Sequence, residues 1–189
     1  MPAVSRPHLL GIDDAPFSKK QAGPVPIIGV TMEGADQVEA VAIGSFPVDG
    51  DHATEFLGDW IGQLRTKSAL QGVMLGGITI AGLGIIDLPA LAERLGVPVL
   101  AVTRNNPSDS ELKAALEAAS LMERYPIVER SPRAYRVSDG LFLAHAGGKR
   151  TTAEELVRAS LGKSRMPEPL RVAHLIGSAM VLGESRGRV

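Results

Sequence analysis

The sequence contains no cysteine among its 189 residues, and only 4% of the residues are aromatic. The first absence excludes disulfide bonds, thiolate nucleophiles and zinc sites with cysteine ligands. The second argues against a nucleic-acid groove lined with stacking rings, for which we consider only Tyr125 and Tyr135 as free candidates. The apolar runs are too short to span a membrane, and no signal peptide is recognisable. We therefore expect a cytoplasmic protein without membrane contacts.

A basic excess is also missing, because the net charge is −1. Proteins that bind nucleic acid usually carry such an excess, since contacts to phosphates dominate their affinity. The basic residues are nevertheless concentrated in the C-terminal third, from Arg124 onward. This distribution fits a local basic face and fits an ordinary solvated helix surface equally well. The length, with 44% hydrophobic residues, indicates one domain over residues 1–189.

Three short apolar runs open the chain: HLLGIDD from His8, PIIGVTM over 26–32 and VEAVAIGSFPV over 38–48. Each is partly β-branched and is bounded by glycine, proline or aspartate, which predicts strands. The short spacing between the runs favours an antiparallel meander.

The rest of the chain alternates between helix and strand patterns. We expect strands over 72–77 and 97–103, and helices over 51–64, 87–96, 110–122 and 153–161. Asp51, Ser108 and Thr151 are predicted to cap helices, and a last helix is expected from Pro167 to about Leu182. The sequence therefore predicts an α/β fold with a mixed sheet, in which a three-strand meander is followed by parallel βα units.

Acidic residues follow two of the predicted strands. Asp13 and Asp14 end the first, at the sheet edge where α/β proteins bind ligands, although aspartate also ends strands as ordinary turn chemistry. Asp49 precedes Gly50 after the third strand and is either a second site carboxylate or part of a plain turn. His174 and Arg171 share one face of the last helix, because they are three residues apart. On that pattern, His174 is either a core histidine or a ligand.

The segment PEPLRVAH over 167–174 resembles the PEP-x-R-x-A-[His/Asp] motif that closes endonuclease V proteins. The whole chain is more similar still to the endonuclease dU family. The matching segments occur in the family's order and cover nearly the full length: GIDDAPF (11–17), IIGVTMEG (27–34), FPVDGDHAT (46–54), MLGGITIAGLGIIDL (74–88), GVPVLAVTR (96–104), MPEPLRVAHLIGSA (166–179) and GESRGR (183–188).

This resemblance implies a ribonuclease H-like fold and a metal-dependent endonuclease that acts at deaminated bases, deoxyuridine in DNA above all. Such enzymes hold Mg²⁺ or Mn²⁺ with carboxylates at strand ends and a residue of the last helix. Carried over, Asp13 matches the acid of the first strand, Asp49 the acid after the third, and His174 the helix ligand. Asp14 is a further candidate ligand.

The resemblance also suggests residues that would contact DNA or RNA. Arg171 and Arg186 are expected near phosphates. Gly82 and Gly84 lie in a glycine-rich segment that shapes the base pocket in the relatives, and close backbone approach to a nucleotide would explain them. An ordinary flexible turn would explain these glycines as well.

One position departs from the endonuclease V pattern. The relatives read Leu-Asp-Gly at the end of the fourth strand, whereas this chain reads Leu75-Gly76-Gly77. Gly76 therefore stands where a third carboxylate is expected. The departure leaves two alternatives to an active metal enzyme: a member that binds nucleic acid without cleaving it, and, less supported, a small-molecule hydrolase that uses the same acids.

Overall fold

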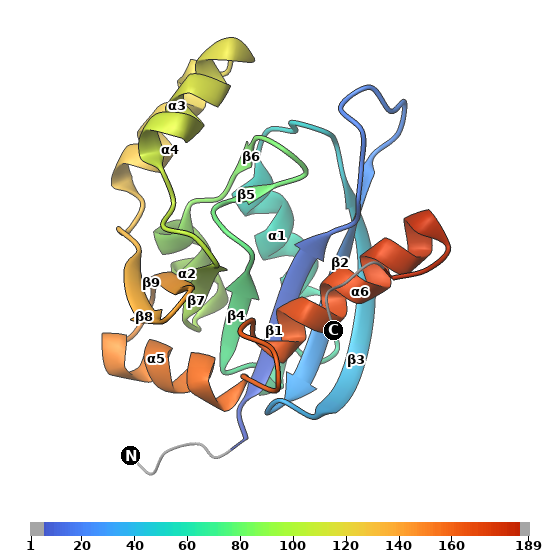
Figure 1. Ribbon diagram of the computed structural model, residues 1–189, viewed down its shortest axis with the longest axis vertical. Helices are drawn as coiled ribbons and strands as arrows, with labels where there is room; N and C mark the ends of the chain where they lie inside the picture. The colour runs from blue at the N-terminus through green and yellow to red at the C-terminus, as the bar shows by residue number, and fades with distance from the viewer. Residues whose placement is uncertain (1–5, 186–189) are drawn as a thin grey trace.

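A seven-stranded mixed sheet forms the centre of the protein, as the computed structural model, which describes residues 6–185, shows (Figure 1). The strand order is β3-β2-β1-β4-β7-β9-β8. The central strands β1, β4 and β7 run parallel, and all other neighbours run antiparallel. The strands are β1 His8–Asp14, β2 Val25–Glu33, β3 Gln37–Phe46, β4 Gly72–Leu75, β7 Val99–Thr103, β8 Tyr135–Ser138 and β9 Leu141–Ala146, with a separate hairpin of β5 Thr79–Ile80 and β6 Gly84–Ile85.

Helices cover both faces of this sheet. The helices are α1 Ala53–Gly62, α2 Leu88–Leu95, α3 Asp109–Ala118, α4 Tyr125–Arg130, α5 Arg150–Ala159 and α6 Glu168–Leu182. Figure 1 shows α6 lying across β1 and β2, with α1 behind the sheet and α3 and α4 projecting as an arm. None of the helices within residues 6–185 is long and apolar enough to cross a membrane.

The alternation of side chains along β1 and β2 explains why helices cover both faces of the sheet. Leu10 and Ile27 join the large cluster formed with α1 and α2, whereas Leu9 packs with α5 and Ile28 packs under α6. Successive strand residues point to opposite faces, so apolar residues at consecutive positions require cover on both sides. These strands consequently lie in the middle of a three-layer sandwich.

The predicted architecture is confirmed, including the meander, the parallel strand β7 and the helix α2 that ends at Gly96. Ser108 caps α3 as expected, because its hydroxyl accepts from the backbone N–H of Glu111. Two other caps were wrong. His52 rather than Asp51 precedes α1, and α5 begins at Arg150, before Thr151, without a side-chain cap. In both cases the helix boundary is displaced by one or two residues, which is the usual uncertainty at helix ends.

Helix α6 approaches the backbone of β1 unusually closely at Gly11. A Cβ atom on Gly11 would lie 2.5 Å from the carbonyl oxygen of Pro169 and 2.6 Å from the nitrogen of Leu170. At Gly177, further along the helix, a Cβ would lie 3.1 Å from Cα of Ala15. The missing side chains at these two crossings allow the helix to rest on the strand. This contact determines where residues of α6 stand relative to the end of β1.

Two arginines hold the arm of α3 and α4 against the rest of the protein. Arg124, whose side chain is only 8% exposed, donates through Nη1 to the carbonyl oxygens of Asp49, Gly50 and Leu83 at 2.8–3.0 Å. At the other end of α4, Arg130 binds Asp87, the residue that caps α2. The arm is thus held at both ends of α4.

Replacing Gly11 by alanine should destabilise the protein by about 1–3 kcal/mol, because the new methyl group would press on helix backbone that cannot rotate away. Gly62→Ala is the matched control, since a Cβ there meets nothing within 4 Å in an exposed last helical position. That substitution should be neutral or slightly stabilising. Urea unfolding of both variants measures the difference. Equal stabilities would show that α6 does not depend on close contact at Gly11.

Replacing Arg124 by methionine should lower the free energy of unfolding by about 3–5 kcal/mol, because three carbonyl oxygens lose a buried cationic donor. Arg136→Met provides the comparison: the Arg136 side chain is 63% exposed, and its partners are exposed Asp139 and the nearby carbonyl oxygen of Ser138. That change should stay within about 0.5 kcal/mol of the wild type. Chemical unfolding monitored by circular dichroism would distinguish the two variants. If Arg124→Met lowers the free energy of unfolding no more than Arg136→Met does, Arg124 does not hold the arm in place.

Candidate functional site

The carboxylate of Asp13 and the imidazole of His174 meet at the carboxyl end of β1. Nδ1 of His174 lies 2.9 Å from Oδ2 of Asp13, although the two residues are 161 positions apart in the sequence. Asp13 points to the α6 side of the sheet, the same side as Gly11, and its side chain is 25% exposed. His174 follows the first turn of α6 and is half exposed. It is therefore a surface residue next to an acid and does not belong to the core.

Burial and a neighbouring acid change the protonation of this pair. The pKa of Asp13 is raised to about 6, chiefly by burial and additionally by the negative charge of Asp14, while the contact with His174 opposes both effects. Burial also raises the pKa of Asp14, against the hydrogen bond from Ala81. Two adjacent carboxyls with raised pKa values form a local excess of negative charge, which is the arrangement that binds a cation or holds a proton.

Asp14 occupies the opposite face of β1 but borders the same small cavity. Its Oδ2 accepts a hydrogen bond of 2.6 Å from the backbone N–H of Ala81. A cavity of about 150 Å³ lies between the ends of β1 and β4. It is lined by Ile12, Asp13, Asp14, Leu75, Gly76, Thr79, Ile80 and Ile86. Because the cavity sits at the strand end, side chains from both faces of β1 reach it.

Gly76 stands directly beside Asp13. A Cβ atom on Gly76 would lie 3.8 Å from Oδ1 of Asp13, with no closer obstacle. An aspartate at this position would place its carboxylate among the same acids. Position 76 therefore has room for a side chain next to Asp13 and carries none.

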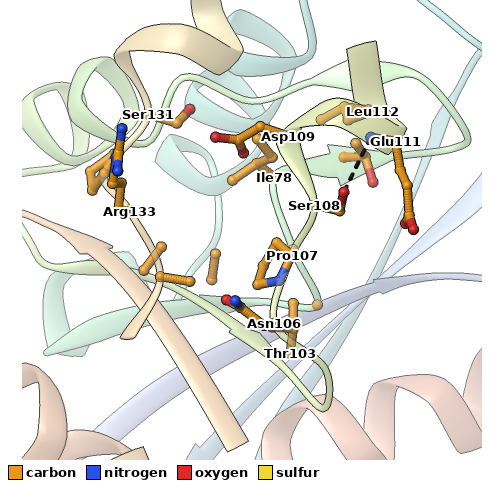
Figure 2. A pocket seen from close by; sticks show the side chains of 17 residues that line it. Ile78, Thr103, Asn106, Pro107, Ser108, Asp109, Glu111, Leu112, Ser131 and Arg133 are labelled. Atoms are coloured by element: carbon orange, nitrogen blue, oxygen red, sulfur yellow. Dashed lines mark hydrogen bonds between the residues drawn. The ribbon is translucent and has the colours of Figure 1, made fainter. Parts of the chain in front are cut away.

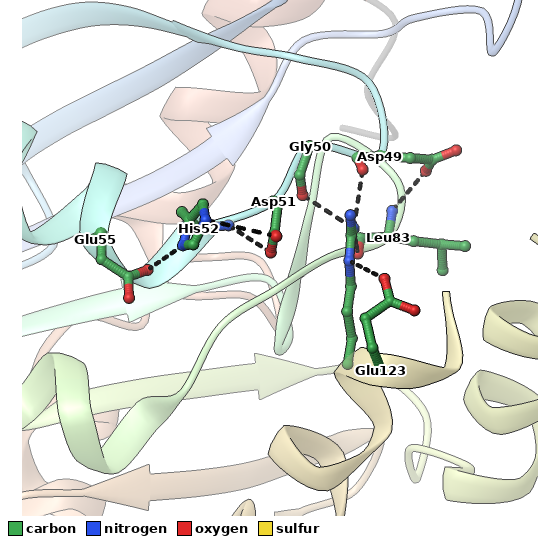
Figure 3. Close-up of polar contacts among 8 residues, drawn as sticks. Asp49, Gly50, Asp51, His52, Glu55, Leu83 and Glu123 are labelled. Atoms are coloured by element: carbon green, nitrogen blue, oxygen red, sulfur yellow. Dashed lines mark hydrogen bonds and ion pairs between the residues drawn. The ribbon is translucent and has the colours of Figure 1, made fainter. Parts of the chain in front are cut away.

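Asp49 contacts the 80–84 loop instead of the pair formed by Asp13 and His174. Its Oδ1 accepts a 2.8 Å hydrogen bond from the N–H of Leu83 (Figure 3). The N–H of Asp49 donates to the carbonyl oxygen of Ala81. The residue adopts a left-handed backbone with φ of 51°. Within residues 6–185, no three or more His, Asp or Glu side chains gather in a way that could hold a metal ion. The structure therefore does not bring Asp49 together with Asp13 and His174.

The glycines of the 80–84 loop face the protein's own atoms. The space that a Cβ would take at Gly82 is occupied by the carboxylate of Asp49, and at Gly84 it is limited by the carbonyl oxygen of Ile80 at 2.7 Å. Close packing inside the chain explains both glycines without a nucleotide. Asp14 and Asp49 both contact this loop, a connection that has no signal in the sequence pattern.

A larger cleft of about 680 Å³ adjoins the small cavity, and Gly76 and Thr79 line both (Figure 2). Its floor consists of small residues, Gly76 and Gly77 after β4, Ala101 of β7 and Ala144 of β9, and its walls come from the segments around α3 and α4. Figure 2 shows polar side chains around the rim. The rim residues with polar or charged side chains are Thr103, Asn106, Ser108, Asp109, Glu111, Ser131 and Arg133.

The basic and aromatic candidates are largely engaged within the protein. Arg171 is paired with Glu168 at 2.6 Å, and Arg186 lies outside the described residues. The ring of Tyr125 is covered by Lys113, and that of Tyr135 is covered by Arg150. The structure thus offers no free stacking platform among these two tyrosines.

The chain matches the family model for endonuclease dU over residues 5–181. A UPF0215 protein of Methanothermobacter thermautotrophicus is 38% identical over 184 residues, which cover 95% of this chain and 90% of that protein. The UPF0215 protein DR_A0167 of Deinococcus radiodurans is 36% identical, with 96% and 92% covered.

Solved structures give the same fold. A protein of unknown function from Archaeoglobus fulgidus superposes with a TM-score of 0.84 at 30% identity, covering 92% of this chain and 98% of that one. Endonuclease V of Ciona intestinalis, in complex with DNA containing an inosine, gives 0.60 at 15% identity, with 94% and 86% covered. Endonuclease V of Bacillus subtilis gives 0.59 at 15% identity, with 93% and 80% covered. The mixed sheet is therefore a ribonuclease H-like fold, and the chain, matched over most of its length by the family model and by these relatives, belongs to the endonuclease dU family.

Proposed function

We propose that the protein is a metal-dependent endonuclease that cleaves DNA at deaminated bases, with deoxyuridine as its main substrate. The observation that carries this proposal is the Asp13–His174 pair, which joins the first strand and the last helix at a cavity bordered by Asp14 and Gly76. Membership of the endonuclease dU family and the fold shared with endonuclease V support it.

The donor set fits one hydrated divalent ion and does not fit two. Mg²⁺ is commonly held by one or two carboxylates, with water and substrate phosphate completing its coordination. Asp13 and Asp14 line one cavity, and His174 stands at its border. When bound there, Mg²⁺ or Mn²⁺ supplies a nucleophilic water and stabilises charge on the phosphodiester. Asp49 would support the site from the loop that contacts Asp14.

His174 is placed to move a proton during cleavage. Its Nδ1 is held by Asp13, and a carboxylate partner fixes the ring and leaves Nε2 free to exchange a proton. Nε2 can therefore give a proton to the leaving oxygen or take one from the attacking water. Asp13 sets the orientation of the ring through the 2.9 Å contact.

The 680 Å³ cleft offers a place for a base that has left the helix. An enzyme that reads a damaged base in duplex DNA must take it out of the stack. The cleft adjoins the acids through Gly76 and Thr79, so a base in the cleft would keep its backbone near the cavity. Small floor residues leave room for the ring, and Asn106 and Ser108 offer hydrogen bonds to its edge.

A second function is favoured by one observation, the absence of a carboxylate at Gly76. With no three-residue cluster of possible metal ligands among the described residues, the chain could bind nucleic acid without cleaving it. The two functions predict different responses to the substitutions below.

Labelled duplexes that carry one deoxyuridine or deoxyinosine should be nicked near the lesion by the wild type in Mg²⁺ or Mn²⁺. Asp13→Ala should lower the rate by at least about a hundredfold, because it removes both a carboxylate ligand and the partner of His174. Asp36→Ala, in which a side chain 77% exposed is lost, is the control and should retain full activity. Binding without nicking, by folded protein in either metal, would favour the non-cleaving alternative.

Gly76→Asp should tighten Mn²⁺ binding by about tenfold or more, because a third carboxylate enters beside Asp13. Titration calorimetry measures this without any substrate, and an oligonucleotide assay follows cleavage in parallel. Cleavage that appears only in Gly76→Asp would identify the native chain as a non-cleaving binder. If the variant neither binds Mn²⁺ more tightly nor alters cleavage, position 76 is not a ligand position.

A further inference from the structure

The large exposed apolar side chains of the protein are concentrated on two elements. Six of the seven within the described residues lie on β3 or on the last turn of α6, and each is 43–57% exposed. They are Val38, Val41, Ile43, Met180, Val181 and Leu182. Isolated surface apolar residues need no explanation, but a clustered set indicates a contact surface.

The strand residues point to the same side of the sheet as α6. Val41 pairs with Val30 and Ile43 pairs with Ile28, and directly paired residues of antiparallel strands share a face. Ile28 and Val30 are covered by α6, where Val172 and Ile176 pack on the same cluster. The row Val41–Ile43 is therefore the uncovered continuation of the surface on which α6 lies.

Met180 extends that surface along the helix, because it follows Val172 and Ile176 at intervals of four residues. Figure 1 shows the last turns of α6 running out past the sheet on the β3 side. The exposed side chains of β3 and this row on α6 together form one apolar strip. We call it the β3–α6 strip, and it consists of Val41, Ile43, Val172, Ile176 and Met180.

The two edges of the sheet are protected very differently. The β8 edge is only four residues long, has an irregular register and carries Arg136. Short length, bulges and charge are the devices that keep edge strands from pairing with other chains. The β3 edge is ten residues long, contains no lysine, arginine or proline, and has Glu39 as its only charge.

The irregularity in β3 leaves a regular segment open. The register with β2 shifts between Val38 and Ala40, so that Glu39 is the extra residue. From Ala40 to Phe46 the pairing is continuous. This segment of regular strand is centred on Ile43, the most exposed of the apolar residues at 57%.

We propose that the β3–α6 strip is an interface between two copies of this chain, formed by antiparallel pairing of β3 with β3 of the second copy about a twofold axis near Ile43. The strip carries no positive charge, which excludes a nucleic-acid backbone as its occupant. An antiparallel pair of identical strands is self-complementary, as a twofold interface requires. The two sheets then join into one.

The expected size is that of a weak but specific dimer. Seven paired residues extend about 24 Å, and a strip about 20 Å wide reaches from the strand edge to the helix, so two copies bury on the order of 1,000 Å². That area is near the lower limit for a specific interface, so we expect a weak dimer. Since β2 and β1 separate β3 from β4, the interface leaves the cavity and the cleft open.

The test is the molar mass of the intact protein in solution, measured by sedimentation equilibrium across concentrations that bracket about 10 µM. The wild type should show a monomer–dimer equilibrium. Ile43→Lys should raise the dimer dissociation constant by about a hundredfold, because each dimer loses two apolar contacts and gains two facing ammonium groups.

Val38→Lys is the matched control, since it introduces the same charge on the same strand at a side chain 45% exposed, ahead of the regular segment. It should change the dissociation constant by no more than about threefold. A wild type that stays monomeric throughout the concentration range overturns the proposal, and so does a dimer that Ile43→Lys leaves intact. Circular dichroism verifies that each variant is folded.

Discussion

The site depends on the close crossing of α6 over β1 at Gly11. Asp13 lies two residues beyond Gly11 on the same face of the strand, and His174 lies about one helical turn beyond Leu170, which contacts Gly11. The two spacings, two residues along a strand and one turn along a helix, are both close to 6 Å. Acid and imidazole therefore meet because the backbones touch at one point. The hydrogen bond between them results from this packing and could not enforce it alone, since an exposed ion pair contributes little.

The acids at this crossing are held in an unfavourable electrostatic state. An acid whose pKa is raised in the folded protein reduces stability as pH rises from its ordinary value through its folded value, here from 3.8 to about 6 for Asp13. At neutral pH the fold therefore carries the full cost of ionising Asp13 next to Asp14. His174 and the N–H of Ala81 offset part of that cost. Under the proposed function, a bound cation would offset the remaining cost and would couple the stability of the fold to occupancy of the site.

Much of the fold followed from local pattern, whereas the site followed only in part. The meander and β7 were readable because buried strands contain uninterrupted apolar residues, and α2 was bounded by Asp87 and Gly96, which both cap it. The β8–β9 hairpin was missed although Asp139-Gly140 marks its turn, because β8 is short and alternates charged with apolar residues.

Within the site, the positions of Asp13 and His174 relative to each other came only from the family resemblance. Nothing in the residues themselves connects two segments 161 positions apart. For Asp49 the local pattern predicted the turn but not the position of the side chain. An acid followed by glycine after a strand predicts a turn, but the direction of the carboxylate depends on the backbone φ of 51° and on the N–H of Leu83. Arg124 left no recognisable pattern, because its role consists entirely of contacts to distant carbonyl oxygens.

The loss of a side chain at Gly76 has two consequences that belong together. The Cβ of a side chain there would lie 3.8 Å from Oδ1 of Asp13, at a position that lines both the small cavity and the large cleft. Without a carboxylate there, the acids lose one anionic neighbour and the two spaces communicate. In the enzyme proposed above, a phosphate oxygen of the bound strand would complete the coordination that Gly76 leaves open, since Mg²⁺ accepts phosphate oxygens in place of protein carboxylates. A site of this kind would bind metal weakly on its own and more tightly together with nucleic acid, and the arm fastened by Arg124 and Arg130 would keep the cleft open for that strand.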